Sequence, residues 1–389
     1  MNLSNKVYFD YAATTPVDER VLKVMLPYFN EIFGNPSSTH TFGQQADAAL
    51  DNSRASIAEA LNCRPDEVVF TSCGSESDNL ALRGAAFMAR QQRGANHILI
   101  APLEHHAISL TARQLADTYG FEVEYLPVDH YGIVHPDDVR ERLRSKTAVV
   151  SVMVANNEIG SINPISDIGA ICREKEILFH SDAVQAAAHL KTDVQALNVD
   201  LLSLGGHKFY APKGVGALYV RKGTPLLPHM TGGGQEFRLR AGTHNIPYIV
   251  ALAEAFRLVQ EEREIRAARL RPLRDRIITD VLEKIPAVQL TGHPTLRLPN
   301  HASFVFQGVD GNTLLAALDM AGFACSSGSA CKTGNPEPSE VLTALGLPRD
   351  WALGSLRVTL GLDTTPEKVN AFLNVLPEMI LRLRRTGLK

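Results

Sequence analysis

A lysine in a glycine-rich segment is the first residue of this sequence whose type and setting suit chemistry. Lys208 follows an apolar run, residues 201–204, and two adjacent glycines in the segment GGHK. Glycines allow a main chain and a neighbouring amine to approach a ligand closely. A lysine near positive or apolar neighbours can have a lowered pKa and act as a Schiff-base nucleophile. Most loop lysines are instead solvated, and Lys213, in a similar glycine and proline loop, competes for the role.

A second segment, residues 68–82 with the sequence VVFTSCGSESDNLAL, could bind an anion. Its apolar start predicts a strand that runs through Gly74 and Ser75 into a helix beginning near Glu76. The N-terminus of a helix offers free N–H groups and the positive end of its dipole, which suit a phosphate. An ordinary N-cap at Ser75 accounts for the same residues, and on this segment alone it is the better explanation.

Asp182 is the third candidate, because it ends the apolar run in the segment ILFHSDAVQ, residues 177–185. Open α/β sheets place ligand-contacting residues at the carboxyl ends of their strands, so this acid could hold a cationic ring nitrogen. A helix N-cap is an equally good explanation. Together, a phosphate site, a carboxylate for a ring nitrogen and a Schiff-base lysine are what pyridoxal 5'-phosphate requires.

A cysteine in a polar loop is the fourth candidate. The segment 323–339, FACSSGSACKTGNPEPS, is rich in glycine, serine and proline and predicts a loop. Cys331 lies there between small residues and Lys332, and an exposed thiol beside a cation can have a lowered pKa and be reactive. Cys325 follows apolar residues and is expected to be the buried one of the two. A redox pair between these cysteines, or two inert thiols, fits the composition equally well.

Alternating apolar and amphipathic segments must position these residues. Between residues 45 and 260 this alternation predicts a mostly parallel sheet with helices on both faces. The expected strands are 68–71, 97–101, 123–127, 148–155, 177–180, 201–204 and 215–220. The expected helices are 44–62, 78–93, 107–119 and 165–175.

The last third of the sequence has a different pattern. A helical stretch over 249–285 contains Pro272, which should kink or break it, and a domain junction is expected nearby. The pattern beyond it is α+β. The strands expected there are 302–306 and 355–360, and the helices are 312–321 and 366–384.

Composition excludes several classes of protein. The 389 residues contain 39 Lys and Arg against 42 Asp and Glu, a net charge of −3, which does not suit nucleic-acid or polybasic membrane binding. We see no membrane-spanning run, secretory signal, GxGxxG motif, P-loop or zinc-type Cys/His spacing, so we expect no metal site. Five sparse cysteines favour a reducing cytoplasm over a disulfide framework.

A series of motifs over nearly the whole chain resembles the NifS/IscS-type cysteine desulfurases, in the class V aminotransferase-like group of fold-type-I pyridoxal phosphate enzymes. The motifs are YFDYAATTP (8–16), FGNPSS (33–38), FTSCGSESDN (70–79), LEHHA (103–107), ANNEIG (155–160), HSDAVQ (180–185), GGHKFYAPKGVGALYV (205–220), GGGQE (232–236), RAGT (240–243), SSGSAC (326–331) and SLRVTLG (355–361).

The resemblance implies a PLP-dependent aspartate aminotransferase-like fold. Its large cofactor-binding domain would span residues 16–262. A smaller α+β domain, made of 1–15 and 263–389, would carry the Cys331 loop.

The resemblance also implies roles around the cofactor ring. Lys208 would bind the cofactor covalently, and Asp182 would pair with the ring nitrogen. Gln185 would hydrogen-bond the phenolic oxygen. His105, chosen over His106 by motif register alone, would stack on the ring and could shuttle protons.

The same resemblance places further residues on the phosphate. Gly74, Ser75, Gly205 and His207 would contact it, and Thr243 would reach it from a partner subunit of a homodimer. Many relatives carry serine where this chain has Gly205, so a hydroxyl ligand is missing and cofactor binding should be weaker.

For the substrate, L-cysteine, the resemblance implies a carboxylate clamp at Arg357, with Asn157 beside the ring and Asn35 assisting. After loss of the α-proton, the Cys331 thiolate would attack the substrate sulfur, keep it as a persulfide and release alanine. The sulfur acceptor, an iron–sulfur scaffold or a thiolation enzyme, stays open. Alternatives are a selenocysteine lyase, a small-amino-acid aminotransferase and a non-catalytic sulfur-relay protein.

Overall fold

The computed structural model of the protein describes residues 6–327 and 337–386. Its helices are α1 (Glu19–Met25), α2 (Pro27–Asn30), α3 (Thr41–Leu61), α4 (Gly74–Arg93), α5 (His106–Tyr119), α6 (Pro136–Arg142), α7 (Ile165–Glu174), α8 (Ile246–Glu261), α9 (Arg263–Lys284), α10 (Gly311–Met320), α11 (Glu340–Ala344), α12 (Arg349–Ala352) and α13 (Pro366–Thr386). Its strands are β1 (Val7–Tyr8), β2 (Val68–Thr71), β3 (His97–Ile100), β4 (Glu122–Tyr125), β5 (Thr147–Ser151), β6 (Leu178–Asp182), β7 (Leu201–Gly205), β8 (Gly216–Val220), β9 (Val288–Leu290), β10 (His301–Phe306), β11 (Phe323–Ala324) and β12 (Ser355–Thr359).

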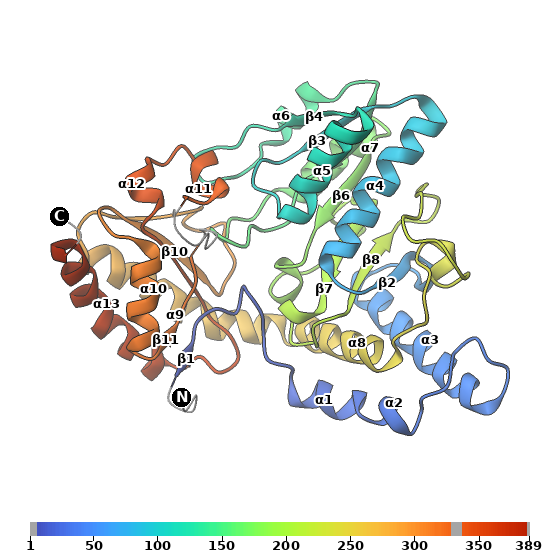
Figure 1. The fold of residues 1–389 in the computed structure, drawn as a ribbon, viewed down its shortest axis with the longest axis horizontal. Coiled ribbons are helices and arrows are strands. Elements are labelled where there is room, and N and C mark those ends of the chain that lie inside the picture. The colour runs from blue at the N-terminus through green and yellow to red at the C-terminus, as the bar shows by residue number, and fades with distance from the viewer. Residues whose placement is uncertain (1–5, 328–336, 387–389) are drawn as a thin grey trace.

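A mixed sheet organises the larger part of the molecule (Figure 1). Within the described residues it contains seven strands in the order β2-β8-β7-β6-β5-β3-β4. The strands from β7 to β4 pair in parallel, whereas β8 runs antiparallel to both β7 and β2. Consequently β2, β3, β5, β6 and β7 all end at the same edge of the sheet. The expected α/β class with a mostly parallel sheet is confirmed.

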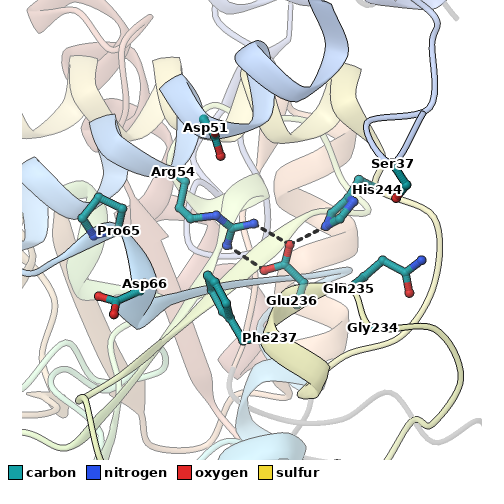
Figure 2. A pocket seen from close by; sticks show the side chains of 10 residues that line it. All are labelled: Ser37, Asp51, Arg54, Pro65, Asp66, Gly234, Gln235, Glu236, Phe237 and His244. Carbon is teal, nitrogen blue, oxygen red and sulfur yellow. Dashed lines mark hydrogen bonds and ion pairs between the residues drawn. The ribbon is translucent and has the colours of Figure 1, made fainter. Parts of the chain in front are cut away.

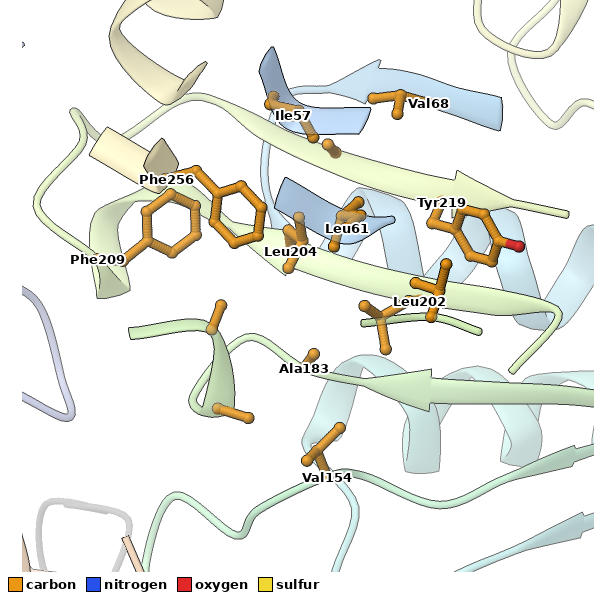
Figure 3. Close-up of a cluster of buried hydrophobic side chains, with 14 of the residues drawn as sticks. Ile57, Leu61, Val68, Val154, Ala183, Leu202, Leu204, Phe209, Tyr219 and Phe256 are labelled. Atoms are coloured by element: carbon orange, nitrogen blue, oxygen red, sulfur yellow. The ribbon is translucent and has the colours of Figure 1, made fainter. Parts of the chain in front are cut away.

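Side chains alternate between two apolar layers along these strands, as a pleated strand buried on both faces requires. In β7, Leu201 packs with α4 and α5, whereas Leu202 and Leu204 face α3 and α8 on the opposite side. Figure 3 shows part of the second layer, where Phe256 of α8 lies beside Phe209. Helices therefore cover both faces of the sheet and hold its strand ends in fixed positions.

A smaller sheet lies beside the first (Figure 1). In the described residues it contains three antiparallel strands in the order β12-β10-β9, and its core is shared with α9, α10 and α13. The N-terminal β1 pairs with β11, and Phe9 is buried in this second core. Because there are two cores, we propose a domain boundary between residues 262 and 263. Residues 1–15 would belong to the smaller domain.

Pro272 was expected to kink or break the helix, and it does not break it. The break lies ten residues earlier, at Glu262, and Pro272 lies inside α9. An interior proline costs a helix about 3 kcal/mol. Burial of Leu270 and Ile277 against the smaller sheet offsets that cost, because each fully buried apolar side chain contributes about 1.5–3 kcal/mol.

None of the helices in the described part of the chain combines the length and apolar character that crossing a bilayer requires.

Candidate active site

The site cavity, a space of about 330 Å³, opens at the edge where β2, β3, β5, β6 and β7 end. It is lined by Ala12, Ala13, Cys73, Gly74, Ser75, Asp78, His105, Met153, Asn157, Asp182, Val184, Gln185, His207, Lys208 and Arg357. Segments far apart in the sequence therefore meet at one site, as ligand sites of open α/β sheets do.

Lys208 reaches the site cavity from a short 3₁₀ turn after β7. Its Nζ donates to the carbonyl oxygens of Ala12 and Ala13, each at 2.7 Å. Burial and the neighbouring Arg357 charge lower the pKa of Lys208 to about 8. Lys213, the competing lysine, is exposed and does not line the cavity. A buried amine whose pKa is lowered towards neutrality can act as a nucleophile.

Asp182 lies at the end of β6 with its carboxylate in the site cavity. One carboxylate oxygen accepts a 2.7 Å hydrogen bond from the Val184 N–H, so the side chain caps a turn, and no α-helix begins there. Burial raises the pKa of Asp182, while His105 and Lys208 act to lower it. A cationic ring nitrogen placed here would stabilise this buried charge.

Two further acids, Asp78 and Glu104, are buried near Asp182. Burial and the Asp182 charge raise the pKa of both carboxyls well above the usual range. Asp78 Oδ1 and Glu104 Oε2 each lack a hydrogen-bond partner among the described residues. The histidine next to Asp78, His180, is neutral: burial lowers its pKa to about 3, and both ring nitrogens lie 2.9 Å from serine hydroxyls. Burial and the Asp182 charge therefore favour the protonated form of Asp78.

Asp78→Asn is expected to stabilise the cofactor-free protein, and more so as pH rises. The folded-state pKa of Asp78 is raised, so the stability that its carboxyl contributes is present at low pH and is lost as pH increases. Between the pKa of Asp78 in the unfolded chain, about 3.9, and its higher pKa in the folded protein, each pH unit lowers the free energy of unfolding by about 1.4 kcal/mol. Asparagine removes this cost without changing the shape of the side chain.

Urea unfolding at a series of pH values from about 4 to about 8, with Asp117→Asn as an exposed control on α5, tests this expectation. Equal stabilities near pH 4 and a growing advantage of the asparagine variant above it are expected. A variant that is less stable than the wild type near pH 7 would show instead that Asp78 is ionised in a stabilising pair.

The N-terminus of α4 forms part of the wall of the site cavity. The helix begins at Gly74 with Cys73 as N-cap, so Ser75 lies in the first turn and the N-cap explanation for Ser75 was wrong. A Cβ at Gly74 would lie 2.6 Å from Val184 Cγ2, so a side chain there would require Val184 to shift. The free N–H groups of this turn and the Ser75 hydroxyl suit a phosphate.

Gly205 is the buried last residue of β7 and does not line the site cavity. A Cβ there would lie 3.2 Å from Val184 Cγ1 and 3.4 Å from the Gly74 nitrogen. A serine at this position would therefore require Val184 to shift, and the chain instead leaves the helix N-terminus and Ser75 to face the cavity.

His105 and His207 both line the site cavity. His105 caps α5, and its Nδ1 accepts from the Ala107 N–H at 3.1 Å, which places a neutral ring's proton on Nε2. Burial lowers the pKa of His105, and burial with Lys208 lowers that of His207 to about 4. His106 lies outside the cavity with its ring exposed, 3.8 Å from Glu340.

Arg357 reaches the site cavity from β12 of the smaller sheet. Its Nη2 donates to Asp10 at 2.8 Å and its Nη1 to the Asn157 carbonyl oxygen at 3.0 Å. The buried Nε has no hydrogen-bond partner among the described residues. The guanidinium lines the cavity beside these contacts, and its planar set of N–H donors suits the forked binding of a carboxylate.

Gln185 and Asn157 complete the lining at the level of the ring site. Gln185 Nε2 donates to the Ala12 carbonyl oxygen at 2.8 Å, next to the Lys208 amine that bonds the same atom. Of the two adjacent asparagines, Asn156 is buried in hydrogen bonds to the main chain, which leaves Asn157 in the cavity.

These residues fit pyridoxal phosphate. An amine of lowered pKa, an acid whose pKa is raised by burial and a helix N-terminus that begins at Gly74 surround one cavity. Each corresponds to one part of the cofactor: the aldehyde, the ring nitrogen and the phosphate.

Comparison with known proteins places the chain in a family. The Aminotransferase class-V family matches residues 7–372. A protein of Methanosarcina thermophila named cysteine desulfurase IscS is 48% identical over 378 residues, 97% of this chain and 93% of that protein. The chain belongs to the cysteine desulfurases of the class-V aminotransferase family.

Solved structures agree with this assignment. One solved structure, described as a NifS-like protein, shares 36% identity with this chain at a TM-score of 0.90. The match covers 97% of this chain and 100% of the solved chain. Another, described as SspA in complex with cysteine, shares 35% identity at a TM-score of 0.79, over 91% and 98% of the two chains.

Two of the expected site residues do not line the site cavity of the same chain. Asn35 and Thr243 are exposed and do not line it. Both lie close in sequence to residues around a second cavity, which Ser37 and His244 help to line (Figure 2). Cys331 lies outside the described residues. Cys325, which was expected to be the buried cysteine, has a pKa raised by burial and by Asp10, as an unreactive thiol would.

Among the residues to which sequence reasoning gave no role, three position the charged groups of the site cavity. Asp10 orients Arg357, and the carbonyl oxygens of Ala12 and Ala13 hold Lys208. All three belong to YFDYAATTP, a motif of the resemblance to which no role was attached. Its mixture of one acid with small residues was the available signal.

Proposed function

We propose that this protein is a pyridoxal phosphate-dependent cysteine desulfurase, which converts L-cysteine to L-alanine and transfers the sulfur to Cys331 as a persulfide. The observation that carries this proposal is the meeting of Lys208, Asp182 and Arg357 at one cavity in a chain of this family. When bound, the cofactor supplies an electron sink for the α-carbon of the substrate.

Each residue of the site cavity has a separate role in the reaction at the α-carbon. Lys208 holds the cofactor, and in its neutral form its Nζ accepts the proton of the substrate α-carbon. Asp182 holds the ring nitrogen in its protonated form. His105 lines the cavity, and in its neutral form it carries a proton on Nε2 that it can donate to a reacting atom.

The substrate is oriented by its carboxylate on the guanidinium of Arg357, which Asp10 and the Asn157 carbonyl oxygen hold in place. This clamp leaves the substrate thiol free for attack by a thiolate from Cys331. The Cys331 sulfur bonds the substrate sulfur, the carbon–sulfur bond breaks with its electrons going to the substrate carbon, and protonation of that carbon completes alanine.

We further propose that the active protein is a homodimer, with Asn35 and Thr243 serving the site cavity of the partner. Large apolar side chains are exposed on α1, on α2, on the segment that follows and at the start of α3. Exposed apolar patches mark protein interfaces. The group comprises Leu22, Leu26, Phe29, Phe33 and Phe42, each 45–63% exposed. Asn35 lies within this segment, and Ser37 lies with His244 at the second cavity.

A reducing cytoplasm is the proposed location, because Cys63, Cys73, Cys172 and Cys325 are free thiols in the structure. The proposed recipient of the sulfur is an acceptor protein, either an iron–sulfur scaffold or a thiolation enzyme.

The test incubates the cofactor-loaded protein with L-cysteine and a thiol reductant and measures alanine, sulfide and α-keto acids. Equal amounts of alanine and sulfide, with no dependence on an added α-keto acid, are expected. Alanine that forms only when pyruvate is added, without sulfide, would identify an aminotransferase instead. Release of selenide from selenocysteine with no reaction of cysteine would favour a lyase.

A further inference from the structure

A strained loop lies outside the site cavity and takes no part in the proposed chemistry of the cysteine substrate. Glu236, Phe237 and Arg238 follow the sequence GGGQ, and their φ angles are +45°, +55° and +68°. Side-chain-bearing residues rarely adopt this left-handed region, and three in succession are strongly unfavourable. Such a conformation persists only where the surrounding structure enforces it.

The Glu236 carboxylate is the group that enforces this conformation (Figure 2). It accepts two hydrogen bonds from the Arg54 guanidinium, at 2.7 and 2.8 Å, and one from the Phe70 N–H at 2.7 Å. A fourth comes from His244 Nε2, at 2.7 Å. The side chain is 1% exposed, so every one of these bonds is shielded from water.

Arg54 is fixed just as firmly as Glu236. Its guanidinium lies 4.7 Å from the ring centre of Phe70, in β2, and 5.0 Å from the ring centre of Phe237, in the strained loop. It also donates to the Val68 carbonyl oxygen at 2.5 Å. Helix α3 and strand β2 therefore act as a rigid base for the strained loop.

The contact between Glu236 and His244 closes the loop at its base. Residues 237–243 lie between these two side chains, and the exposed Thr243 is next to His244. Gln235 accepts from the Gly242 N–H at 3.2 Å, and Arg240 pairs with Glu76 of α4 at 2.8 Å. The loop is thus held at both ends and at its middle, with Thr243 facing outwards.

We propose that Glu236 is a positioning residue that fixes Thr243 for the cofactor phosphate in the partner subunit. The proposal rests on the proposed function, because it requires a homodimer in which Thr243 reaches that phosphate. The strained conformation would then hold the Thr243 hydroxyl in a defined place on the surface before the partner subunit binds. The serine hydroxyl missing at Gly205 makes this donor more important to the phosphate site.

The test compares the affinity of the cofactor-stripped, full-length protein for pyridoxal 5'-phosphate and for pyridoxal, which lacks the phosphate. Glu236→Gln is expected to weaken binding of the phosphorylated form about tenfold, a loss typical of one hydrogen bond to a charged group. Binding of pyridoxal is expected to change by less than about twofold. Thr243→Ala should give the same pattern, and the double variant should lose no more than either single variant.

His244→Ala is a second, milder variant, because it opens the base of the loop while the Arg54–Glu236 pair stays intact. Glu261→Gln, an exposed position on α8, is the control and should match the wild type. The proposal is overturned if both ligands weaken equally, if the losses of the single variants multiply in the double variant, or if Thr243→Ala has no effect. None of these results would affect alanine production by the wild type, so the proposed function would still hold.

Discussion

Lys208→Ala is expected to abolish turnover of L-cysteine, with kcat reduced about 10²–10⁴-fold or more, the range that a positioned proton-transfer group contributes. The site cavity holds one amine in the described lining, and Lys208 supplies it. Its loss removes both the covalent attachment of the cofactor and the base for the α-proton. The variant should also lose the cofactor during gel filtration and lack the visible absorption of a lysine-bound cofactor.

Lys213→Ala is the matched control, because Lys213 lies on the same stretch of chain but is exposed to solvent. It should retain wild-type turnover and absorption. Lys208→Arg keeps the positive charge without the nucleophile and should remain inactive. A Lys208→Ala protein that holds the cofactor with unchanged absorption, or a Lys213→Ala protein that loses it, would show that the attachment lysine has been misassigned.

Arg357→Ala is expected to lower kcat/KM for L-cysteine about 10²–10³-fold, because truncating one partner of a buried, hydrogen-bonded charge pair costs about 2–5 kcal/mol. The Arg357 side chain is 8% exposed and lines the site cavity, where its guanidinium can bind a carboxylate. Most of the loss should appear in KM, because the substrate carboxylate is bound before and during the reaction.

Arg357→Lys separates the geometry of this clamp from its charge. Lysine can pair with Asp10 but cannot present a fork to a carboxylate, so an intermediate loss is expected. Arg140→Ala, at an exposed position on α6, should match the wild type. An Arg357→Ala enzyme with an unchanged KM for L-cysteine would place the carboxylate elsewhere in the site.

The sequence alone was enough to predict most elements near the site, because buried parallel strands are short apolar runs. Strand β2, for example, lies over residues 68–71 as expected. The α4 boundary was less predictable: the helix begins at Gly74, ahead of the expected start. Local composition leaves a helix start uncertain by a few residues, and here that shift moves Ser75 from a cap into the first turn.

Long-range partners account for most of what the sequence could not predict. Asp10 pairs with Arg357 across 347 positions, and nothing in the spacing of these residues requires them to meet. The same is true of Arg54 and Glu236, which are 182 positions apart. Pro272 failed as a helix breaker because packing, which the sequence does not display, outweighed a local preference.

The buried acids show a related limit. Asp78 belongs to the motif FTSCGSESDN and would be read as one more polar residue of a helix. Its raised pKa depends on burial beside Asp182, and its neighbour His180 is kept neutral by burial among hydroxyl partners from different strands. Such a state follows from the fold and cannot be obtained from the order of residues.

The central claim is that sulfur from L-cysteine passes to Cys331, and mass spectrometry of the protein after a single exposure to L-cysteine tests it most directly. We expect the peptide containing Cys331 to gain the mass of one sulfur atom and a reductant to remove it, while Cys331→Ala neither gains it nor forms alanine. Alanine formation with no added sulfur on Cys331, or undiminished activity of Cys331→Ala, would contradict the claim.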